Sequence, residues 1–393
     1  MSKLYKEKLQ CTGCHGCANI CPVQAVTMKS DDEGFLYPII DEEKCIGCHL
    51  CEQVCPIHKS SCASEKTPNA FAAVCTYENI RMGSSSGGVF PVLAEYILKK
   101  NGAVFGAVST EDCKSVEHQV AFNIDENTAQ RGSKYLQSRI GSTYKQAEEL
   151  LKSGKMVLFT GTPCQIAGLY AYLRKNYENL YTQDLICHGV PSPLVWKKYL
   201  DEMEKKARKS IKSVSFRNKG RGWKNYSLRV EFSNRSIYCK SLIEDPYLKG
   251  FMSDLFLRPS CYECRYKSIG RQADITLADF WGVEKVFPEL DDDCGVSLIY
   301  VHSQKGKELL DAVRNDFVLK PVDANLGAQY NPAMIKSSRC PERRRDFMAD
   351  LHNFSYKRLS RKYLQPSVFE KLSLMACRVL RGVLRRIKGY LKK

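Results

Sequence analysis

Eight of the 19 cysteines fall into two copies of one spacing, C-x2-C-x2-C-x3-C-P. The copies are Cys11, Cys14, Cys17 and Cys21, followed by Pro22, and Cys45, Cys48, Cys51 and Cys55, followed by Pro56. Gly13 and Gly47 stand between the cysteines, where glycine allows the backbone to turn tightly. The first part of the chain must therefore fold around a bulky group that is held by closely spaced thiols.

This spacing is typical of bacterial ferredoxins, in which three neighbouring cysteines and one from the other motif hold each [4Fe-4S] cluster. We therefore assign one cluster to Cys11, Cys14, Cys17 and Cys55, and the second to Cys45, Cys48, Cys51 and Cys21. Zinc is the main alternative, because four-cysteine zinc sites also use C-x2-C pairs. Zinc sites rarely need a third cysteine two residues further on, so the spacing favours iron-sulfur clusters and one-electron chemistry.

The length of the chain, 393 residues, predicts roughly two to three domains. We expect a cluster domain at residues 1–57, a polar linker at 58–69, a body at 70–338 and a basic helical tail at 339–393. Residues 1–10 lack the apolar core of a signal peptide, so we expect a cytoplasmic protein rather than a secreted disulfide scaffold. No run approaches the roughly 20 apolar residues that cross a bilayer.

Strand, glycine loop and helix follow one another repeatedly in the body. The strand signals are at residues 70–76, 103–108, 156–159 and 180–186, and the helix signals are at residues 89–100, 166–174 and 195–207. This order predicts an α/β body with sites where the strands end. Residues 211–241 alternate with period two and predict an antiparallel segment. The predicted fold is an α+β ferredoxin-like cluster domain, then an α/β body with an antiparallel segment, then a basic C-terminal helix.

Positive charge is concentrated at the C-terminus. Residues 339–393 carry 16 Lys and Arg against 4 Asp and Glu, whereas the rest of the chain has a net charge of +5. Residues 368–391 predict an amphipathic helix with a single apolar stripe. Such a helix is typical of peripheral contact with the inner face of a membrane or of docking on a partner, and equally of a terminal helix packed on the body. No nucleic-acid partner is expected, because no recognised binding motif accompanies the basic tail.

Two polar loops of the body carry donors for an anionic cofactor. Residues 83–88 (GSSSGG) precede a helix, so their N–H groups could hold a phosphate or pyrophosphate, although a linker turn uses the same residues. Residues 132–138 (GSKYLQS) combine hydroxyls, a cation and an amide, which suit a negatively charged, ring-bearing cofactor and equally a capped helix start. His188 is a candidate proton donor, although a lone histidine is more often structural.

Four further cysteines are candidates for a third site. Cys164 and Cys187 each follow a predicted strand, and Cys261 and Cys264 form a C-x2-C pair. Folding could bring these thiols together as a four-thiolate site. Buried free cysteines, a zinc site and a redox dithiol remain alternatives for the same residues.

Seven motifs in order resemble the coenzyme F420-reducing hydrogenase and dehydrogenase beta-subunit family, joined behind a two-cluster ferredoxin domain. The motifs are SSGG at 85–88, GSKY at 132–135, GTPCQ at 161–165, CHG at 187–189, SFR at 215–217 with GW at 222–223, CYECRY at 261–266 and DITLADFW at 274–281. The resemblance spans residues 67–315. Unlike the hydrogenase subunits, this chain carries its own two-cluster domain, which is similar to family members that take electrons from ferredoxin and reduce an organic substrate.

The resemblance implies an FAD bound to the body and a third [4Fe-4S] cluster on Cys164, Cys187, Cys261 and Cys264. It implies flavin contacts from Ser85, Ser86, Gly87, Gly88, Gly132, Ser133, Lys134, Tyr135, Gln137, Ser138, Gly161, Thr162, Pro163 and Gln165. We therefore predict an iron-sulfur flavoprotein oxidoreductase with a ferredoxin or another redox protein as partner and an organic two-electron substrate. The alternatives are a non-catalytic electron-transfer subunit that serves a partner enzyme, or an F420-reducing subunit.

Overall fold

The structure is a computed structural model that describes residues 4–58 and 67–364. The predicted C-terminal helix at residues 368–391 and most of the predicted linker lie outside the described residues. Among the residues described, no helix is both long enough and apolar enough to cross a membrane.

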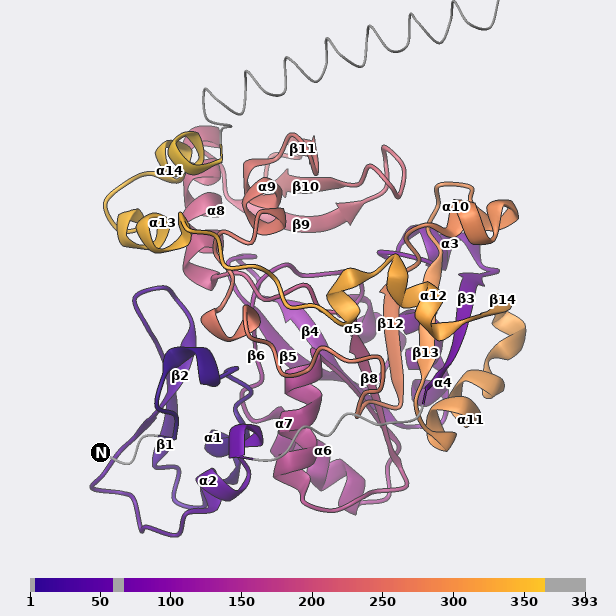
Figure 1. Cartoon of the computed structure of the whole chain (residues 1–393), viewed down its shortest axis with the longest axis horizontal. Coiled ribbons are helices and arrows are strands. Elements are labelled where there is room, and N and C mark those ends of the chain that lie inside the picture. Colours follow the sequence, from indigo (N-terminus) through magenta and orange to yellow (C-terminus); the bar gives the residue numbers. More distant parts are fainter. Residues whose placement is uncertain (1–3, 59–66, 365–393) are drawn as a thin grey trace, which may run out of the picture.

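The N-terminal region is a small α+β unit (Figure 1). Its elements are η1 (Lys8–Gln10), α1 (Gly16–Ile20), β1 (Val26–Ser30), β2 (Leu36–Ile40), α2 (Leu50–Gln53) and η2 (Pro56–His58). Strands β1 and β2 pair antiparallel, with Val26 opposite Ile40, so a hairpin joins the two cysteine motifs. The Asp31 carboxylate accepts from the N–H groups of Glu33 and Phe35 and closes the turn between the strands.

The body is built on a nine-stranded mixed sheet in the order β14-β3-β13-β12-β8-β7-β4-β5-β6. The strands are β3 (Asn69–Cys75), β4 (Ala103–Ser109), β5 (Val116–Ala121), β6 (Ser138–Arg139), β7 (Val157–Thr160), β8 (Leu180–Leu185), β12 (Ile275–Asp279), β13 (Ser297–Val301) and β14 (Phe317–Val322). Neighbours β4, β7, β8 and β12 run parallel. Their carboxyl ends therefore lie at one edge of the sheet.

Helices cover both faces of this sheet. Val104 of β4 packs with α4 (Val89–Lys99) and α11 (Gln304–Ala312), whereas its neighbours Ala103 and Phe105 pack with α6 (Thr143–Lys152) and α7 (Pro163–Leu173). Successive side chains of a strand point to opposite faces, so the two helix pairs lie on opposite sides of the sheet. Shorter helices of the body are α3 (Glu78–Met82), α5 (Ile124–Thr128), α10 (Val283–Val286) and α12 (Ala324–Gln329). Short turns lie at η3 (Pro259–Cys261), η4 (Pro288–Leu290), η5 (Arg314–Asp316) and η6 (Pro332–Met334).

The segment predicted to be antiparallel forms a separate three-stranded sheet. Its strands are β9 (Ile211–Asn218), β10 (Ser227–Phe232) and β11 (Ile237–Ser241), in the order β11-β10-β9. An aromatic core packs beneath it, with contributions from α8 (Pro193–Ala207), α9 (Pro246–Met252), α13 (Arg344–Asp350) and α14 (Tyr356–Tyr363). The start of the basic tail thus packs on the body, through buried residues such as Phe347 and Leu359.

The N-terminal region docks on the body through buried charged groups. Arg258 is fully buried and donates to the carbonyl oxygens of Cys11 and Leu36 in the N-terminal region. Arg344 donates to both carboxylate oxygens of Glu33, at 3.0 and 2.5 Å. Helix α1 lies against α7 (Figure 1). These contacts place the two cysteine motifs beside the edge of the sheet where Cys164 and Cys187 lie.

Candidate functional site

The first thiol set, Cys11, Cys14, Cys17 and Cys55, lines one pocket of the N-terminal region. Three of these cysteines come from the first motif and one from the second, which is the crossed arrangement expected from the spacing. The pKa of Cys14 is raised to about 12, first by burial and then by the nearby Cys11 and Cys55. The Cys14 thiol is therefore protonated at neutral pH in the metal-free protein, and a metal cluster would displace this proton.

The two cysteine loops repeat one backbone conformation. Each places a glycine and a histidine in the left-handed region, with φ of 66° and 64° at Gly13 and His15 and 68° and 56° at Gly47 and His49. In the first loop, the nearby N–H of Gly16 opposes the rise in the pKa of the Cys14 thiol. Donors directed at sulfur suit an anionic cluster, because they stabilise negative charge on its ligands.

The second thiol set is more open to solvent. Cys45 and Cys48 are exposed, whereas Cys51 is half-buried. Cys21 is buried and packs in the same apolar cluster as Cys51, next to Ala25. The structure thus brings Cys21 toward the second motif, as the crossed arrangement requires, and leaves one side of this set at the surface.

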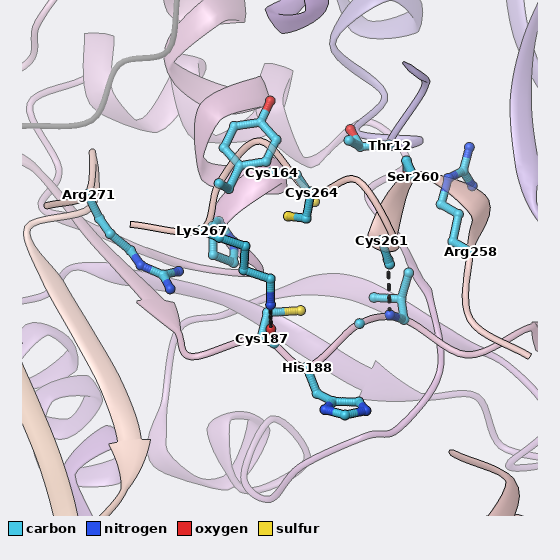
Figure 2. A pocket seen from close by; sticks show the side chains of 14 residues that line it. Thr12, Cys164, Cys187, His188, Arg258, Ser260, Cys261, Cys264, Lys267 and Arg271 are labelled. Atoms are coloured by element: carbon cyan, nitrogen blue, oxygen red, sulfur yellow. Dashed lines mark hydrogen bonds between the residues drawn. The ribbon is translucent and has the colours of Figure 1, made fainter. Parts of the chain in front are cut away.

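The four scattered body cysteines line a single pocket (Figure 2). Cys164 is in the first turn of α7, directly after β7, and Cys187 follows β8. The two thiols meet because β7 and β8 are parallel neighbours whose carboxyl ends share an edge. Cys261 and Cys264 reach the pocket from the loop that begins with η3. Burial raises the pKa of Cys164 well above its usual value, and the other three thiols raise it further.

Three cationic side chains surround the body thiols, namely Arg258, Lys267 and Arg271. Lys267 donates to the carbonyl oxygen of Cys187 at 2.5 Å, and Arg271 pairs with Asp184 at 3.4 Å. These charges oppose the effect of burial, because Lys267 and Arg271 lower the pKa of Cys187. A four-thiolate cluster is anionic, so buried positive charge beside four thiols fits such a group.

The first thiol set and the body thiol set lie in adjoining pockets. Thr12 and Tyr266 line both. The pKa of the Tyr266 hydroxyl is raised well above its usual value by burial first, then by Cys164 and Cys14, one thiol from each set. Within residues 4–58 and 67–364, no three His, Cys, Asp or Glu side chains converge on a position for a single metal ion. The thiols line the walls of two neighbouring pockets instead.

The segments expected to contact a flavin are connected to one another. The hydroxyl of Ser85 accepts from the N–H of Ser133 at 2.8 Å, which joins the serine-glycine loop to the second polar loop. The amide of Gln165 donates to the hydroxyl of Ser138 at 3.0 Å and joins that loop to the start of α7. Thr162 begins this helix, and its N–H donates to Gln165, while Pro163 occupies the first helical position.

Several polar groups of these segments already form hydrogen bonds to other parts of the protein. Ser86 donates to the carbonyl oxygen of Val296, and the N–H of Gly87 donates to Ser297. Gly88 precedes α4 with a φ of 90°, and a Cβ at Gly87 would lie 2.3 Å from the carbonyl oxygen of Ala73. These two glycines are therefore required by the packing of the loop, whether or not a cofactor binds there.

The second polar loop runs from solvent to the thiol pockets. Gly132 is exposed, with a φ of 79°, and Lys134 donates to the carbonyl oxygens of its own turn at 2.9 Å. Burial lowers the pKa of Lys134 to about 7. Tyr135 packs against Phe251, and Gln137 accepts from Arg258 at 2.9 Å beside the thiols.

Gly161, in the third of the expected flavin segments, donates its N–H to the carbonyl oxygen of Gln183 in the neighbouring strand β8.

His188 lines the body pocket, but its ring contacts Asp254 and Phe251. Its Nε2 atom lies 2.6 Å from the Asp254 carboxylate, and the ring packs edge-on against Phe251. Figure 2 shows the ring directed away from the cysteine sulfurs. A role for His188 as a proton donor stays a prediction.

Reasoning from the sequence assigned no role to a buried polar cluster next to Tyr135. Arg217 donates to both carboxylate oxygens of Asp279, at 2.7 and 3.0 Å, and to the hydroxyl of Tyr135. Trp223 donates to the same carboxylate, and its ring stacks on Trp281 at 4.8 Å. Arg217, Trp223, Asp279 and Trp281 all belong to motifs of the family resemblance, which could have drawn attention to them. Their contact, however, depends on the packing of β9 near the end of β12.

Comparisons with known proteins give matches to two regions. Residues 154–325 match the family described as the C terminus of the beta subunit of coenzyme F420 hydrogenase/dehydrogenase. Residues 10–58 match the 4Fe-4S dicluster domain. No curated protein matches the chain.

Among solved structures, the chain is similar to one from the F420-reducing [NiFe] hydrogenase complex of Methanosarcina barkeri. The two are 19% identical, the match covers 70% of this chain and 97% of that chain, and the TM-score is 0.47. The dicluster match spans the eight cysteines of the two N-terminal motifs, and the second match spans the four body cysteines. The chain therefore combines a 4Fe-4S dicluster domain at residues 10–58 with a region, residues 154–325, that matches the C-terminal part of the coenzyme F420 hydrogenase/dehydrogenase beta subunit.

Proposed function

We propose that this protein is an iron-sulfur flavoprotein oxidoreductase that exchanges electrons with a ferredoxin-type protein and acts on an organic two-electron substrate. In this proposal, residues 1–57 hold two [4Fe-4S] clusters, 58–69 link them to an FAD- and cluster-binding body at 70–338, and 339–393 form a tail. The observation that carries the proposal is the pair of adjoining four-thiol pockets that share Thr12 and Tyr266.

When bound, the clusters supply one-electron transfer, and FAD interconverts single electrons and a hydride equivalent. The residues of the chain hold and insulate these groups. Cysteine thiolates ligate the iron, and Arg258 and Lys267 offset the negative charge of the body site. Cys11 is buried and the other thiols of the first and body sets are half-buried, so these two sets are more shielded from solvent than the exposed Cys45 and Cys48 of the second set.

The exposure of the second thiol set supports an external redox partner. Cys45 and Cys48 lie on a surface loop whose Ile46 side chain is 64% exposed. A partner protein that docks here approaches the second set directly, whereas the body thiols lie beneath the surface. Electrons would therefore enter or leave the chain at this loop.

Two buried donors beside the expected flavin segments support an anionic cofactor. Among the described residues, the Nε atoms of Arg131 and Arg217 are buried without a hydrogen-bond partner. Arg131 directly precedes the Gly132–Ser133 turn, and Arg217 contacts Tyr135. Buried guanidinium donors without an acceptor are costly, and the phosphates and ring oxygens of FAD would satisfy them.

Quantification of iron, sulfide and flavin on anaerobically purified protein tests the proposal. We expect about twelve iron atoms and one FAD per chain, which is the content of three [4Fe-4S] clusters and one flavin. Eight iron atoms without flavin would overturn it, by the same counting.

Cys164→Ser tests the ligand set of the body site. We expect this variant to lose about four iron atoms and keep about eight, because the N-terminal sets do not use Cys164. Cys340→Ser is the matched control, since Cys340 is exposed and belongs to none of the three sets. Equal iron content in both variants would contradict the assignment.

The family description favours a second candidate, an electron-transfer beta subunit that serves a partner enzyme or F420. The isolated chain would then carry its clusters but reduce no organic substrate without the partner. Turnover assays of the isolated chain with reduced ferredoxin, with and without F420 as acceptor, distinguish this candidate from the first.

A further inference from the structure

Helix α7 carries Cys164 and Gly168 one turn apart on the same face. A Cβ at Gly168 would lie 2.8 Å from the Cβ of Cys14 and 3.1 Å from its sulfur. It would also lie 2.9 Å from the hydroxyl of Tyr144, which donates to the carbonyl oxygen of Gln165 at 2.6 Å. Only a residue without a side chain lets Cys14 pack directly on the helix at this point.

Helix α1 of the N-terminal region also packs closely against α7. Gly16 lies against the same turn of α7, where a Cβ would be 3.6 Å from the carbonyl oxygen of Gly168. Helix α1 and helix α7 therefore meet through two glycines. A thiol of the first set and a thiol of the body set consequently lie about one helical turn apart, roughly 5 Å along the axis of α7.

Tyr266 occupies the remaining space between the two sets. It lines both pockets, and it lies two residues after Cys264, in the loop that supplies two of the four body thiols. An aromatic ring here fills the junction with protein atoms.

We propose that Gly168 and Tyr266 are positioning residues that set the separation and coupling of the first thiol set and the body thiol set. Gly168 fixes how closely Cys14 approaches α7, and Tyr266 keeps water out of the junction. An electron that crosses oxidises one site and reduces the other, and no bond forms or breaks. The inference rests on the proposed function, because it requires a cluster at each site.

The test compares spin coupling in the full-length, cluster-loaded chain after reduction with dithionite. We expect the EPR spectrum of the wild-type protein to show splitting from interacting clusters. Gly168→Ala should weaken the part of this splitting that comes from the first and body clusters, because the added methyl group must move Cys14 away from the helix, whereas coupling between the two N-terminal clusters should remain. Gly220→Ala is the control, since Gly220 is exposed, its φ is not positive, and the same methyl group there would meet only the end of the Asn218 side chain.

Two variants of Tyr266 keep the proposal testable if Gly168→Ala does not fold. Tyr266→Phe keeps the ring and should retain the splitting, whereas Tyr266→Leu should weaken it at unchanged iron content. Wild-type spectra in Tyr266→Leu and Gly168→Ala, with full iron, would overturn the inference. A wild-type protein with only eight iron atoms would instead overturn the proposed function, and the inference with it, so the iron count separates the two failures.

Discussion

Lys267 places a positive charge beside the body thiols and directs its hydrogen bonds to backbone oxygens. Its ammonium group donates to the carbonyl oxygens of Cys187 and Ala333, at 2.5 and 2.9 Å. Arg258, on another side of the pocket, likewise donates to two carbonyl oxygens and the amide of Gln137. Buried cations are stable when an anion balances them, so the two side chains suit a negatively charged cluster.

We expect Lys267→Met to make the reduction potential of the body cluster more negative. The substitution keeps the apolar length of the side chain and removes a charge that favours the extra electron of the reduced state. An EPR-monitored redox titration measures the potential, with Lys267→Arg as the control that retains the charge. Equal potentials in all three proteins would show that this ammonium group does not act on the cluster.

At the scale of residues, the sequence predicted most of the thiols that the structure brings together. Three thiols of each N-terminal set follow from spacing, because they are neighbours in the chain, and the fourth follows from the crossed arrangement that this spacing is typical of. Arg258 and Lys267 could not be assigned in this way, since nothing in their local sequence shows which pocket they face. Tyr266 belongs to a motif of the family resemblance, but its place between two sets depends on the docking of a separate region.

At the scale of elements, the start of α7 determines where Cys164 lies. Thr162 caps the helix, its N–H is bound by Gln165, and its hydroxyl is 3.1 Å from the Cys164 sulfur. Pro163 follows with a backbone angle suited to the first turn. The cap therefore orients a thiol of the body set as well as ending the preceding loop.

We expect Thr162→Ala to destabilise the protein by about 0.5–2 kcal/mol, the usual effect of losing such a cap. The variant should also retain less iron at the body site, because Cys164 loses a hydrogen-bond partner. Thr162→Ser keeps a capping hydroxyl and serves as the control. Thermal unfolding and iron quantification check the two effects, and a wild-type result for Thr162→Ala in both would contradict the role of the cap.

The sequence also predicted individual elements better than their pairing. The helices and strands around residues 89–108 and 156–207 are confirmed, because hydrophobic period and glycine loops are local signals. The placement of β3 between β13 and β14 could not be predicted. Strand β3 is more than 200 residues before both β13 and β14. The local sequence pattern does not indicate which distant strands it pairs with.

At the scale of the whole molecule, one ion pair joins the N-terminal hairpin to the C-terminal helices. Arg344 of α13 binds Glu33 through two contacts and also donates to the carbonyl oxygen of Leu257. The Arg344 side chain is 11% exposed and that of Glu33 is 21% exposed. This pair connects segments more than 300 residues apart and holds the hairpin beside the aromatic core.

We expect Glu33→Gln to lower the free energy of unfolding by roughly 1–3 kcal/mol, because a mostly buried guanidinium loses its charged partner. Asp311→Asn is the control, since its pair with Lys307 is exposed and such pairs contribute about 0–1 kcal/mol. Anaerobic thermal unfolding compares the variants. Equal midpoints for the two would mean that the ion pair does not secure the docked region.

The fully buried guanidinium of Arg258 has a kinetic consequence. Separating the N-terminal region from the body would remove the acceptors that Cys11 and Leu36 provide for it, so the two parts stay in contact. Electron exchange between them is then a first-order event whose rate does not fall on dilution. A free ferredoxin must instead find its acceptor by diffusion, at a rate that depends on the concentrations of both proteins and on salt.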